Sequence, residues 1–348
     1  MRTSYGPPQA ARQTRRKPMT RWTQRPEGSN WGEFGDDDQL GRLNLITAER
    51  RLAATREVRE GIAFPLSLPL DFPRGEYAAG PRKPPVLSST PLGHNHRFLP
   101  TVPDVVSDDL AVLHLQYSTQ WDSFAHHGAV FDLDGTGEPA ICYYNGYRAD
   151  IDVVGAPDGS VPPHAGALGI ETIAQTGVQG RGVLIDLEQA VGHQRVAVGY
   201  EMLMEIMEAQ DVTVEAGDIL CLHTGLTAIM LDLGDDLTQE TLDGSCAVLD
   251  SQDHRLLQWI TDCGLSAIVA DNVAVEPFSL NPAPGAESVL PLHTHCLFKQ
   301  GIPLGEMWYL ADLARWLRQH ERARFLLTAP PLRLPGAVGS PVSGVATV

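Results

Sequence analysis

The sequence predicts an α/β or mixed α+β fold, because short buried strands alternate with helices along the chain. Three apolar runs have the length and β-branched content of buried strands: GVLIDL at 182–187, DILCLHTG at 218–225 and SAIVADN at 266–272. Helical patterns occupy Tyr200–Gln210 and Gln252–Cys263, and a further one follows at Met307–Gln319. Such alternation favours helices packed on a largely parallel or mixed sheet.

The first elements after the N-terminal region are also marked by local signals. Thr47 is placed to cap a helix from Ala48 to Glu60, which Gly61 ends. The run FPLSLPLDFP at 64–73 alternates apolar residues with prolines, which predicts an edge strand. Residues 73–105 are rich in Pro and Gly and predict a long functional loop. The run FLLTAPPLRLPG at 325–336 predicts one more strand, closed by prolines.

Composition points to small-molecule chemistry. The 348 residues are 43% hydrophobic and 20% charged, as in ordinary globular proteins. A formal charge of −17 disfavours nucleic-acid or membrane partners. The five cysteines have no CxxC spacing, and no apolar run approaches the roughly 20 residues of a membrane span or forms a secretion signal. We therefore expect a cytoplasmic enzyme with a small-molecule substrate.

The chain divides into a tail and one catalytic domain. Residues 1–26 are rich in Arg, Gln, Pro and Thr and nearly free of acids, which predicts a basic, disordered tail. From residue 27 to residue 348 the composition is that of a single folded domain.

Polar side chains crowd into residues 113–128, LHLQYSTQWDSFAHHG. If the first part of this segment is extended, its even-numbered residues project from one face, and a convergent polar face must be solvated, hydrogen-bonded or metal-bound. These residues are His114, Gln116, Ser118, Gln120 and Asp122.

Within this segment, STQWDSFAHHG resembles the HxGTHxDxPxH signature of bacterial kynurenine formamidases, isatin hydrolases and other cyclase-family proteins. The resemblance extends over most of the chain from Trp22 onward, including SAIVADNVAVE and PLHTHCLFKQGIPLGE. It implies the swivelling β/β/α cyclase-like fold in a single domain, and assembly as a homodimer or homotetramer.

The resemblance also implies a set of site residues. In the family, two histidines and an aspartate of the signature bind a divalent metal, the last histidine is an acid or base, and a later histidine and glutamate complete the centre. Carried over by position, the metal ligands are Gln116, Gln120, Asp122, His293 and Glu306, and the catalytic residue is His126.

Two of these ligands depart from the family pattern, because Gln116 and Gln120 replace histidines. The remaining donors are mostly oxygen atoms, which suit Mn²⁺ better than Zn²⁺. We therefore expect one divalent ion, with Mn²⁺ favoured. His114 is a candidate substitute ligand if the strand is extended.

The expected activity is hydrolysis of an amide or cyclic amide C–N bond, or of a lactone or ester. A metal lowers the pKa of a water molecule and polarises a carbonyl, and His126 transfers the proton. Two alternatives stay open: a metal-assisted lyase, dehydratase or cyclase of a biosynthetic pathway, and a non-catalytic family member that has lost its metal.

Candidate substrate-binding residues are Trp31, Phe34, Trp121 and Asn272. Aromatic residues could line an apolar pocket, although they more often belong to the core. Asp271, Asn272 and Glu276 follow the predicted strand at 266–272, a common place for polar site residues, although the first two could only cap a turn.

Overall fold

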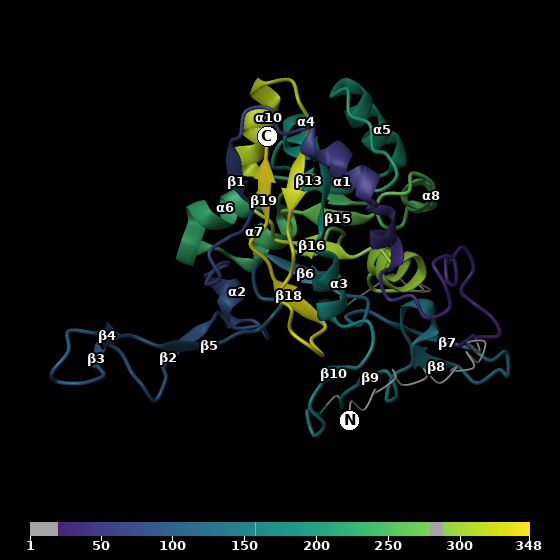
Figure 1. The fold of residues 1–348 in the computed structure, drawn as a ribbon. Helices are drawn as coiled ribbons and strands as arrows, with labels where there is room; N and C mark the ends of the chain where they lie inside the picture. Colours follow the sequence, from purple (N-terminus) through teal and green to yellow (C-terminus); the bar gives the residue numbers. More distant parts are fainter. Residues whose placement is uncertain (1–19, 157, 279–287) are drawn as a thin grey trace, which may run out of the picture.

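A computed structural model describes residues 20–156, 158–278 and 288–348, and over these ranges the protein is built on a nine-stranded sheet (Figure 1). The four strands β11, β13, β15 and β16 run parallel, and the other pairings are antiparallel. The mixed α/β fold predicted from the sequence is therefore confirmed. From edge to edge the order is β1 (Ala63–Pro65), β19 (Val345–Thr347), β17 (Arg324–Thr328), β11 (Gln179–Asp186), β13 (Ile219–His223), β15 (Ala267–Ala270), β16 (Leu304–Glu306), β6 (Gln120–Asp122) and β18 (Gly339–Pro341).

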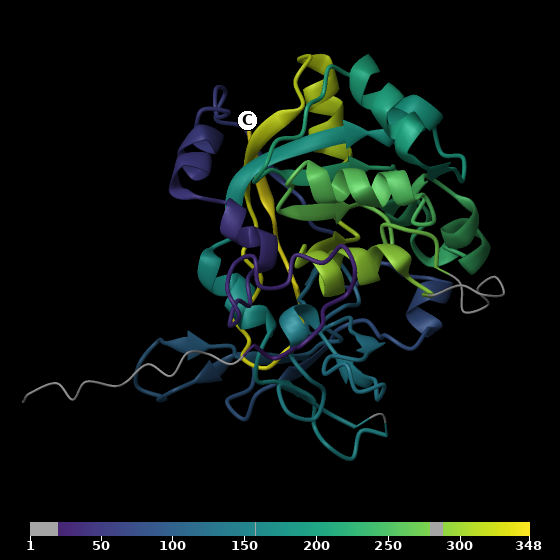
Figure 2. The same cartoon turned by 90° about the vertical axis from the view of Figure 1, so that its right-hand side faces the viewer.

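Both faces of this sheet are covered (Figure 2). Alternate residues of a strand point to opposite faces. Val183 and Ile185 of β11 therefore enter one apolar core, which also receives Leu203 and Leu256 from the helices α5 (Tyr200–Ala209) and α8 (His254–Asp262). Leu184 enters the other core, together with side chains of α10 (Ala311–Gln319). The central strands are thus fixed from both sides, which holds the residues at their ends in place.

The remaining elements are short. The helical ones are η1 (Gly41–Leu45), α1 (Ala48–Thr55), α2 (Glu76–Ala79), η2 (Tyr144–Gly146), α3 (Ile170–Thr176), α4 (Leu187–Val191), α6 (Leu226–Leu233), η3 (Gly234–Asp236), α7 (Gln239–Gly244), α9 (Pro291–His293) and η4 (Thr294–Gln300). Small two-stranded sheets pair β7 (Ala129–Phe131) with β8 (Ala140–Cys142), β9 (Val153–Val154) with β10 (His164–Ala165), and β12 (Ala197–Val198) with β14 (Val248–Leu249). No helix within the described ranges has the length and apolar character needed to cross a bilayer.

Local signals located several elements but not all of their ends. The Thr47 side chain accepts a hydrogen bond from the Arg50 amide and caps α1 as predicted, yet the helix ends at Thr55 instead of Glu60. The predicted edge strand is β1 and lies at the sheet edge, but it ends at Pro65. The helix predicted from Met307 begins only at Ala311, because the amides of Met307 and Trp308 bond the carbonyls of Asn272 and Ala270.

The predicted tail boundary is wrong for residues 21–26, which pack on the body of the protein. Arg21 pairs with Asp37 at 2.7 Å, and the Trp22 ring lies 5.6 Å from the Trp31 ring, edge to face. The Thr23 amide donates to the Leu133 carbonyl at 2.8 Å. The rest of the predicted tail, residues 1–19, lies outside the described residues.

Residues 73–105 do not form a simple loop, which corrects the prediction. After α2 the chain forms β2 (Val86–Ser89), β3 (His96–Arg97), β4 (Val105–Val106) and β5 (Asp109–Val112), with β2 paired to β5 and β3 to β4. We call residues 86–112 the arm, because this ribbon projects from the body (Figure 1). At its base the Arg82 guanidinium donates to the Gln116 carbonyl at 2.8 Å.

Candidate metal centre and active site

Two neighbouring strands bring three of the predicted site residues together. In the antiparallel pairing of β6 with β16, Gln120 lies opposite Glu306, and Asp122 lies two residues further along the same face. All three side chains are buried. Gln120 Nε2 donates to Glu306 Oε2 at 3.0 Å and to Asp122 Oδ1 at 3.3 Å. The cluster therefore follows from strand register.

His293, the last residue of α9, completes the cluster. Its Nε2 lies 3.2 Å from Glu306 Oε1, and its Nδ1 lies 2.8 Å from Glu276 Oε1. Glu276 also accepts the backbone amides of Leu292 and His293, so it fixes both the ring and the turn that carries it. One ligand atom from each of Asp122, His293 and Glu306 lies within 4.8 Å of the others.

Burial and charge perturb the pKa values of this cluster. Burial works to lower the pKa of His293, but its hydrogen bonds to Glu276 and Glu306 outweigh burial and raise it to about 10. Burial and the charge of Asp122 raise the pKa of Glu306 to about 7. Several buried carboxylates lie close together around one imidazole, and this arrangement favours the binding of a cation.

The donor atoms fit a divalent metal ion. In the described part of the chain, Gln120 Oε1 and Asp122 Oδ2 are buried oxygen atoms without a hydrogen-bond partner, which costs free energy unless a cation or water satisfies them. Glu276 holding Nδ1 of His293 leaves Nε2 facing the carboxylates, as in the carboxylate–histidine–metal arrangement of metalloproteins. Asp122, His293 and Glu306 therefore fit the ion, with Gln120 as a further oxygen donor if its amide turns over.

The cluster opens into a cavity of about 410 Å³, and His126 lies on the cavity wall. Its Nε2 is 3.9 Å from Asp122 Oδ1, and the side chain is 23% exposed. Burial lowers the pKa of His126 more than Asp122 raises it, so the ring is neutral near pH 7 and can accept a proton. Asn272 also lines the cavity, while its amide donates to the Ala247 carbonyl and its oxygen accepts from the Val275 amide.

The expected aromatic substrate contacts are corrected by the structure. Trp31 is buried against Phe298, to whose carbonyl its indole donates, and Trp121 points away from Gln120 to pack on Trp308 with ring centroids 5.1 Å apart. Neither these residues nor Phe34 lines the cavity. Successive side chains of β6 point to opposite faces of the sheet. Because Gln120 and Asp122 face the cluster, Trp121 between them points to the other face.

The extended strand proposed for residues 113–122 is present only from Gln120 to Asp122. The Tyr117 amide bonds the His114 carbonyl in a turn, and His114 is exposed, so His114 does not share the face of the cluster. The Gln116 amide lies against Gly339, where an added Cβ would be 2.5 Å from Nε2. No hydrogen bond of the described residues joins the Gln116 side chain to the cluster, so its role as a ligand stays a prediction.

Two residues of the cavity lining, Arg82 and Glu276, had no role assigned from the sequence. Arg82 lies on the cavity wall, and no carboxylate of the described residues is paired with it. It comes from a segment with no motif, so nothing in the sequence identifies it. Glu276 lies six residues beyond the end of β15, in the acidic stretch that the sequence did point to. Asp271 accepts the amides of Thr224 and Gly225, a capping role outside the cavity.

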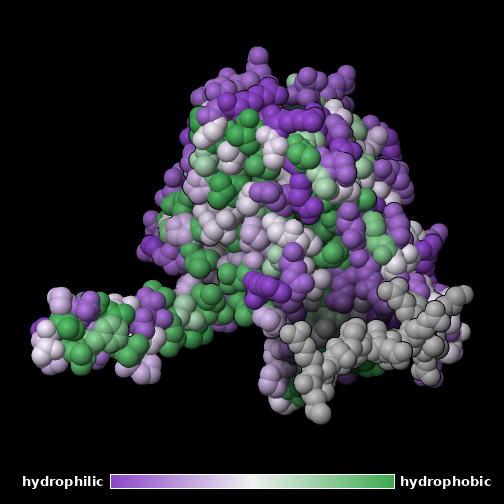
Figure 3. Space-filling model, in the orientation of Figure 1, coloured by the Kyte–Doolittle hydropathy of each residue, from purple (hydrophilic) through white to green (hydrophobic). Residues whose placement is uncertain are grey.

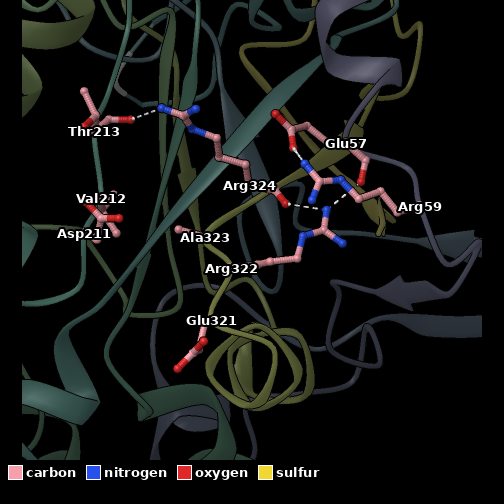
Figure 4. Close-up of a pocket in the computed structure, with 9 residues that line it drawn as sticks. All are labelled: Glu57, Arg59, Asp211, Val212, Thr213, Glu321, Arg322, Ala323 and Arg324. Atoms are coloured by element: carbon pink, nitrogen blue, oxygen red, sulfur yellow. Dashed lines mark hydrogen bonds and ion pairs between the residues drawn. The ribbon is translucent and has the colours of Figure 1, made fainter.

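Two other clusters are explained by internal pairing. Asp186, Glu188 and His223 form a second group of ligand-type residues, but Asp186 caps α4, bonds His223 at 2.9 Å and pairs with Arg318. A shallow hollow of about 380 Å³ is bordered by three arginines (Figure 4). Arg322 and Arg324 there donate to the carbonyls of Glu57 and Thr213. Both clusters therefore serve to join elements.

Fold and cluster together define the class: a mixed α/β protein with a buried histidine–carboxylate site that opens into a cavity of about 410 Å³. Comparison with known proteins gives the family. Residues 65–277 match the family model Cyclase, described as "Putative cyclase". A crystal structure of a novel cyclase is 30% identical, with a TM-score of 0.73, over 92% of this chain and 97% of that chain. The chain belongs to the cyclase family.

More distant structures share the fold. Isatin hydrolase A from Labrenzia aggregata is 14% identical, with a TM-score of 0.53, over 87% of this chain and 99% of that chain. Isatin hydrolase A from Ralstonia solanacearum is 14% identical, with a TM-score of 0.53, over 86% of this chain and 97% of that chain. At this identity the likeness concerns the fold alone. No curated protein sequence matches the chain.

Proposed function

We propose that the protein is a metal-dependent hydrolase that cleaves an amide or cyclic amide C–N bond, or a lactone or ester. The observation that carries this proposal is the buried cluster of Asp122, His293 and Glu306, which opens into a cavity with His126 on its wall. Membership of the cyclase family and the fold shared with isatin hydrolases support the same chemistry. The cavity of about 410 Å³ has the size of a small-molecule site.

Asp122, His293 and Glu306 would hold the metal, together with the amide oxygen of Gln120. When bound, the ion supplies positive charge that acidifies water and polarises the substrate carbonyl. The oxygen-rich donor set favours Mn²⁺ over Zn²⁺. Glu276 orients the His293 ring and keeps Nε2 available to the site.

His126 acts as the acid and base. Its lowered pKa keeps the imidazole neutral near pH 7, so the ring accepts the proton of the attacking water and then donates it to the leaving nitrogen or oxygen. Asp122 Oδ1 lies 3.9 Å from Nε2 of His126 and stabilises the protonated ring between the two transfers. Arg82 faces the same cavity and provides a cationic contact for the substrate.

The cavity wall limits the substrate to a partly apolar small molecule. Tyr77, Leu226 and Phe278 contribute apolar surface, while the polar groups gather around the cluster. We also propose a cytoplasmic location, because all five cysteines are free thiols.

Oxygen incorporation tests the reaction type. A panel of amides, cyclic amides and lactones is incubated with the Mn²⁺-loaded protein in ¹⁸O-labelled water, and the products are analysed by mass spectrometry. Hydrolysis places one solvent oxygen in the product acid, and chelation abolishes the reaction. Turnover without solvent oxygen in the product would instead establish a lyase or cyclase reaction.

A non-catalytic role is the second candidate, because Gln120 donates to both Asp122 and Glu306 and so partly stabilises the site without a metal. It requires that the protein fails to bind Mn²⁺ or Zn²⁺. The metal-binding measurements below separate it from the hydrolase.

Glu276→Gln is expected to weaken metal binding about 10–100-fold while the protein stays folded. The amide keeps an acceptor for Nδ1 of His293 but removes the charge that makes the imidazole a stronger ligand. The measurement is calorimetric titration with Mn²⁺. Glu188→Gln is the matched control, because Glu188 bonds His193 at 2.8 Å outside the cavity, and its affinity should equal that of the wild type. Equal affinity of Glu276→Gln and wild type would contradict the assigned role.

Metal affinity is expected to rise with pH. The metal-free protein binds a proton on His293, whose pKa is raised to about 10, and below about pH 7 another on Glu306, whose pKa is raised to about 7. Both protons must leave before the metal binds, so affinity rises about tenfold per pH unit from 7 to 10 and more steeply below 7. Titrations in buffers of different ionisation enthalpy count the released protons, and binding without proton release at pH 8 would be contrary to this expectation.

The raised pKa values of His293 and Glu306 also make the metal-free protein less stable as pH rises. Both folded-state pKa values lie above the unfolded values, so their contribution to the stability of the metal-free protein is complete below about pH 4.5 and is lost as pH rises through about 7 and then 10.

A further inference from the structure

One cation on the wall of the candidate active site has no acidic partner. Arg82 lines the cavity, and its Nη1 donates to the Gln116 carbonyl at 2.8 Å. Among the residues that the structure describes, no carboxylate forms an ion pair with Arg82. A guanidinium has several N–H donors, so Arg82 keeps donors free for a ligand. Its planar fork of N–H groups matches the two oxygen atoms of a carboxylate.

The carboxylates on the same wall do not compete for Arg82, because each already accepts a hydrogen bond from another residue. They belong to Glu76, Asp243, Glu276 and Glu306. The first two accept hydrogen bonds from Gln239, at 2.7 Å and 3.0 Å. The last two flank the His293 ring, at 2.8 Å and 3.2 Å. The charge of Arg82 therefore stays available to a ligand in the cavity.

Arg195 also lines the cavity, but it is less suited to bind an anion. Its guanidinium donates to the Ser245 carbonyl at 3.4 Å. Burial lowers the pKa of Arg195, and the nearby negative charge of Asp243 opposes that effect. Because Asp243 offsets part of the charge of Arg195, Arg82 is the better candidate for an anion-binding residue.

Arg82 lies close to the groups that would carry out the reaction. Burial lowers the pKa of His126 and raises that of Glu306, and the charge of Arg82 acts to lower both. Arg82 also lies beside Tyr77. Burial raises the pKa of Tyr77 to about 12 against that charge, so the hydroxyl stays protonated and can donate. The Tyr77 ring packs on Tyr117, with ring centroids 5.6 Å apart, which fixes its position.

We propose that the substrate carries a carboxylate a few bonds from the scissile carbonyl, and that Arg82 and the Tyr77 hydroxyl bind this carboxylate. The proposal rests on the hydrolase function above and names its substrate class, an amide, cyclic amide or lactone that bears a carboxylic acid. The rest of the molecule contacts the apolar part of the wall, at Leu226 and Phe278.

The protein as a whole does not attract an anion. The chain has a formal charge of −17, and Figure 3 shows hydrophilic residues over the upper part of the body. Charges on the outer surface are screened over about 10 Å in dilute salt solution, so a cation inside the cavity decides which ligand binds there. Preference for a carboxylate therefore depends on Arg82 in particular.

Calorimetric titration with a matched pair of probes tests the proposal. N-benzoylglycine carries an amide and a carboxylate, and N-benzoylglycinamide has a neutral amide in place of the carboxylate. Both are titrated into the full chain after a chelator has removed metal, so that neither metal coordination nor turnover contributes. The wild type should bind the acid about 10–100-fold more tightly than the amide, which is the range expected for hydrogen bonds to a charged group.

Four variants locate the preference. Arg82→Gln should bind both probes equally, and unchanged affinity for N-benzoylglycinamide would show that its cavity is intact. Arg82→Lys keeps the charge but not the fork of N–H groups, so it should retain part of the preference. Tyr77→Phe should weaken binding of the acid about 3–10-fold. Arg195→Gln is the matched control and should keep the full preference.

Equal binding of the two probes by the wild type, or no binding of N-benzoylglycine, would overturn the proposal. An undiminished preference in Arg82→Gln, or its loss in Arg195→Gln instead, would also overturn it. Failure of the hydrolase proposal has a different signature, because it concerns metal content and turnover, whereas these affinities are measured without either.

Discussion

His126→Asn is expected to lower kcat by about 10²–10⁴-fold and to leave the metal content unchanged. His126 lies on the cavity wall with Nε2 3.9 Å from Asp122 Oδ1, yet it is not a member of the ligand cluster. Asparagine can form hydrogen bonds but cannot take up and return a proton near pH 7. The variant should therefore bind metal and substrate normally and fail at proton transfer, which steady-state kinetics and elemental analysis together detect.

The adjacent histidine supplies the control. His127 Nε2 bonds the Thr294 hydroxyl at 3.0 Å, and the residue does not line the cavity. His127→Asn should therefore change kcat by a small factor only. Equal losses in the two variants would indicate a packing effect and would remove His126 from the proposed mechanism.

Asp122→Asn is expected to weaken metal binding at least about 100-fold and, in the absence of metal, to raise the melting temperature. Asp122 is completely buried, one of its oxygen atoms has no hydrogen-bond partner among the described residues, and its charge opposes ionisation of Glu306. Replacing that carboxylate by an amide removes a ligand and an uncompensated buried charge together, a gain in unfolding free energy of about 1–3 kcal/mol. Loss of binding with a gain of stability is typical of a functional residue.

Asp218→Asn is the contrasting variant. Asp218 is as deeply buried, but it receives two hydrogen bonds from the Arg181 guanidinium, at 2.8 Å and 3.0 Å. Breaking this pair should lower the unfolding free energy by about 3–5 kcal/mol and leave metal binding intact. If Asp122→Asn also lowered the melting temperature of the metal-free protein, Asp122 would be a structural residue.

The strands of the sheet centre were predictable from sequence because burial on both faces demands continuous apolar runs, which β11, β13 and β15 show. The N-cap of α1 was predictable for a local reason, the hydroxyl of Thr47. The early end of α1 and the late start of α10 were not, because contacts distant in sequence decide them, such as the bond from the Met307 amide to the Asn272 carbonyl.

The strands of the arm were not predictable, because every residue of β2 and β5 is exposed. Such strands lack the alternation of apolar and polar residues that a half-buried strand shows. The aromatic predictions for Trp31 and Trp121 failed for a similar reason, since composition does not tell which face of a strand or loop meets the core. Their indole groups bond the carbonyls of Phe298 and Ala329 inside the protein.

The site could be predicted only in part. The residues that resemble the family signature do meet, with Gln120, Asp122 and Glu306 placed by strand register and His293 by the turn at α9. The register itself, the carboxylate of Glu276 behind His293, and Arg82 on the cavity wall depend on segments far apart in the chain. A single sequence does not contain the spatial relation between them.

The central claim, that Asp122, His293 and Glu306 hold a catalytic metal, is tested most directly by elemental analysis of protein purified without chelator, for the wild type and for Asp122→Asn. We predict about one equivalent of a divalent metal, with manganese favoured, in the wild type and its loss in the variant. Absence of metal from both proteins, even after incubation with Mn²⁺ and Zn²⁺, would contradict the metal-dependent hydrolase and favour the non-catalytic role.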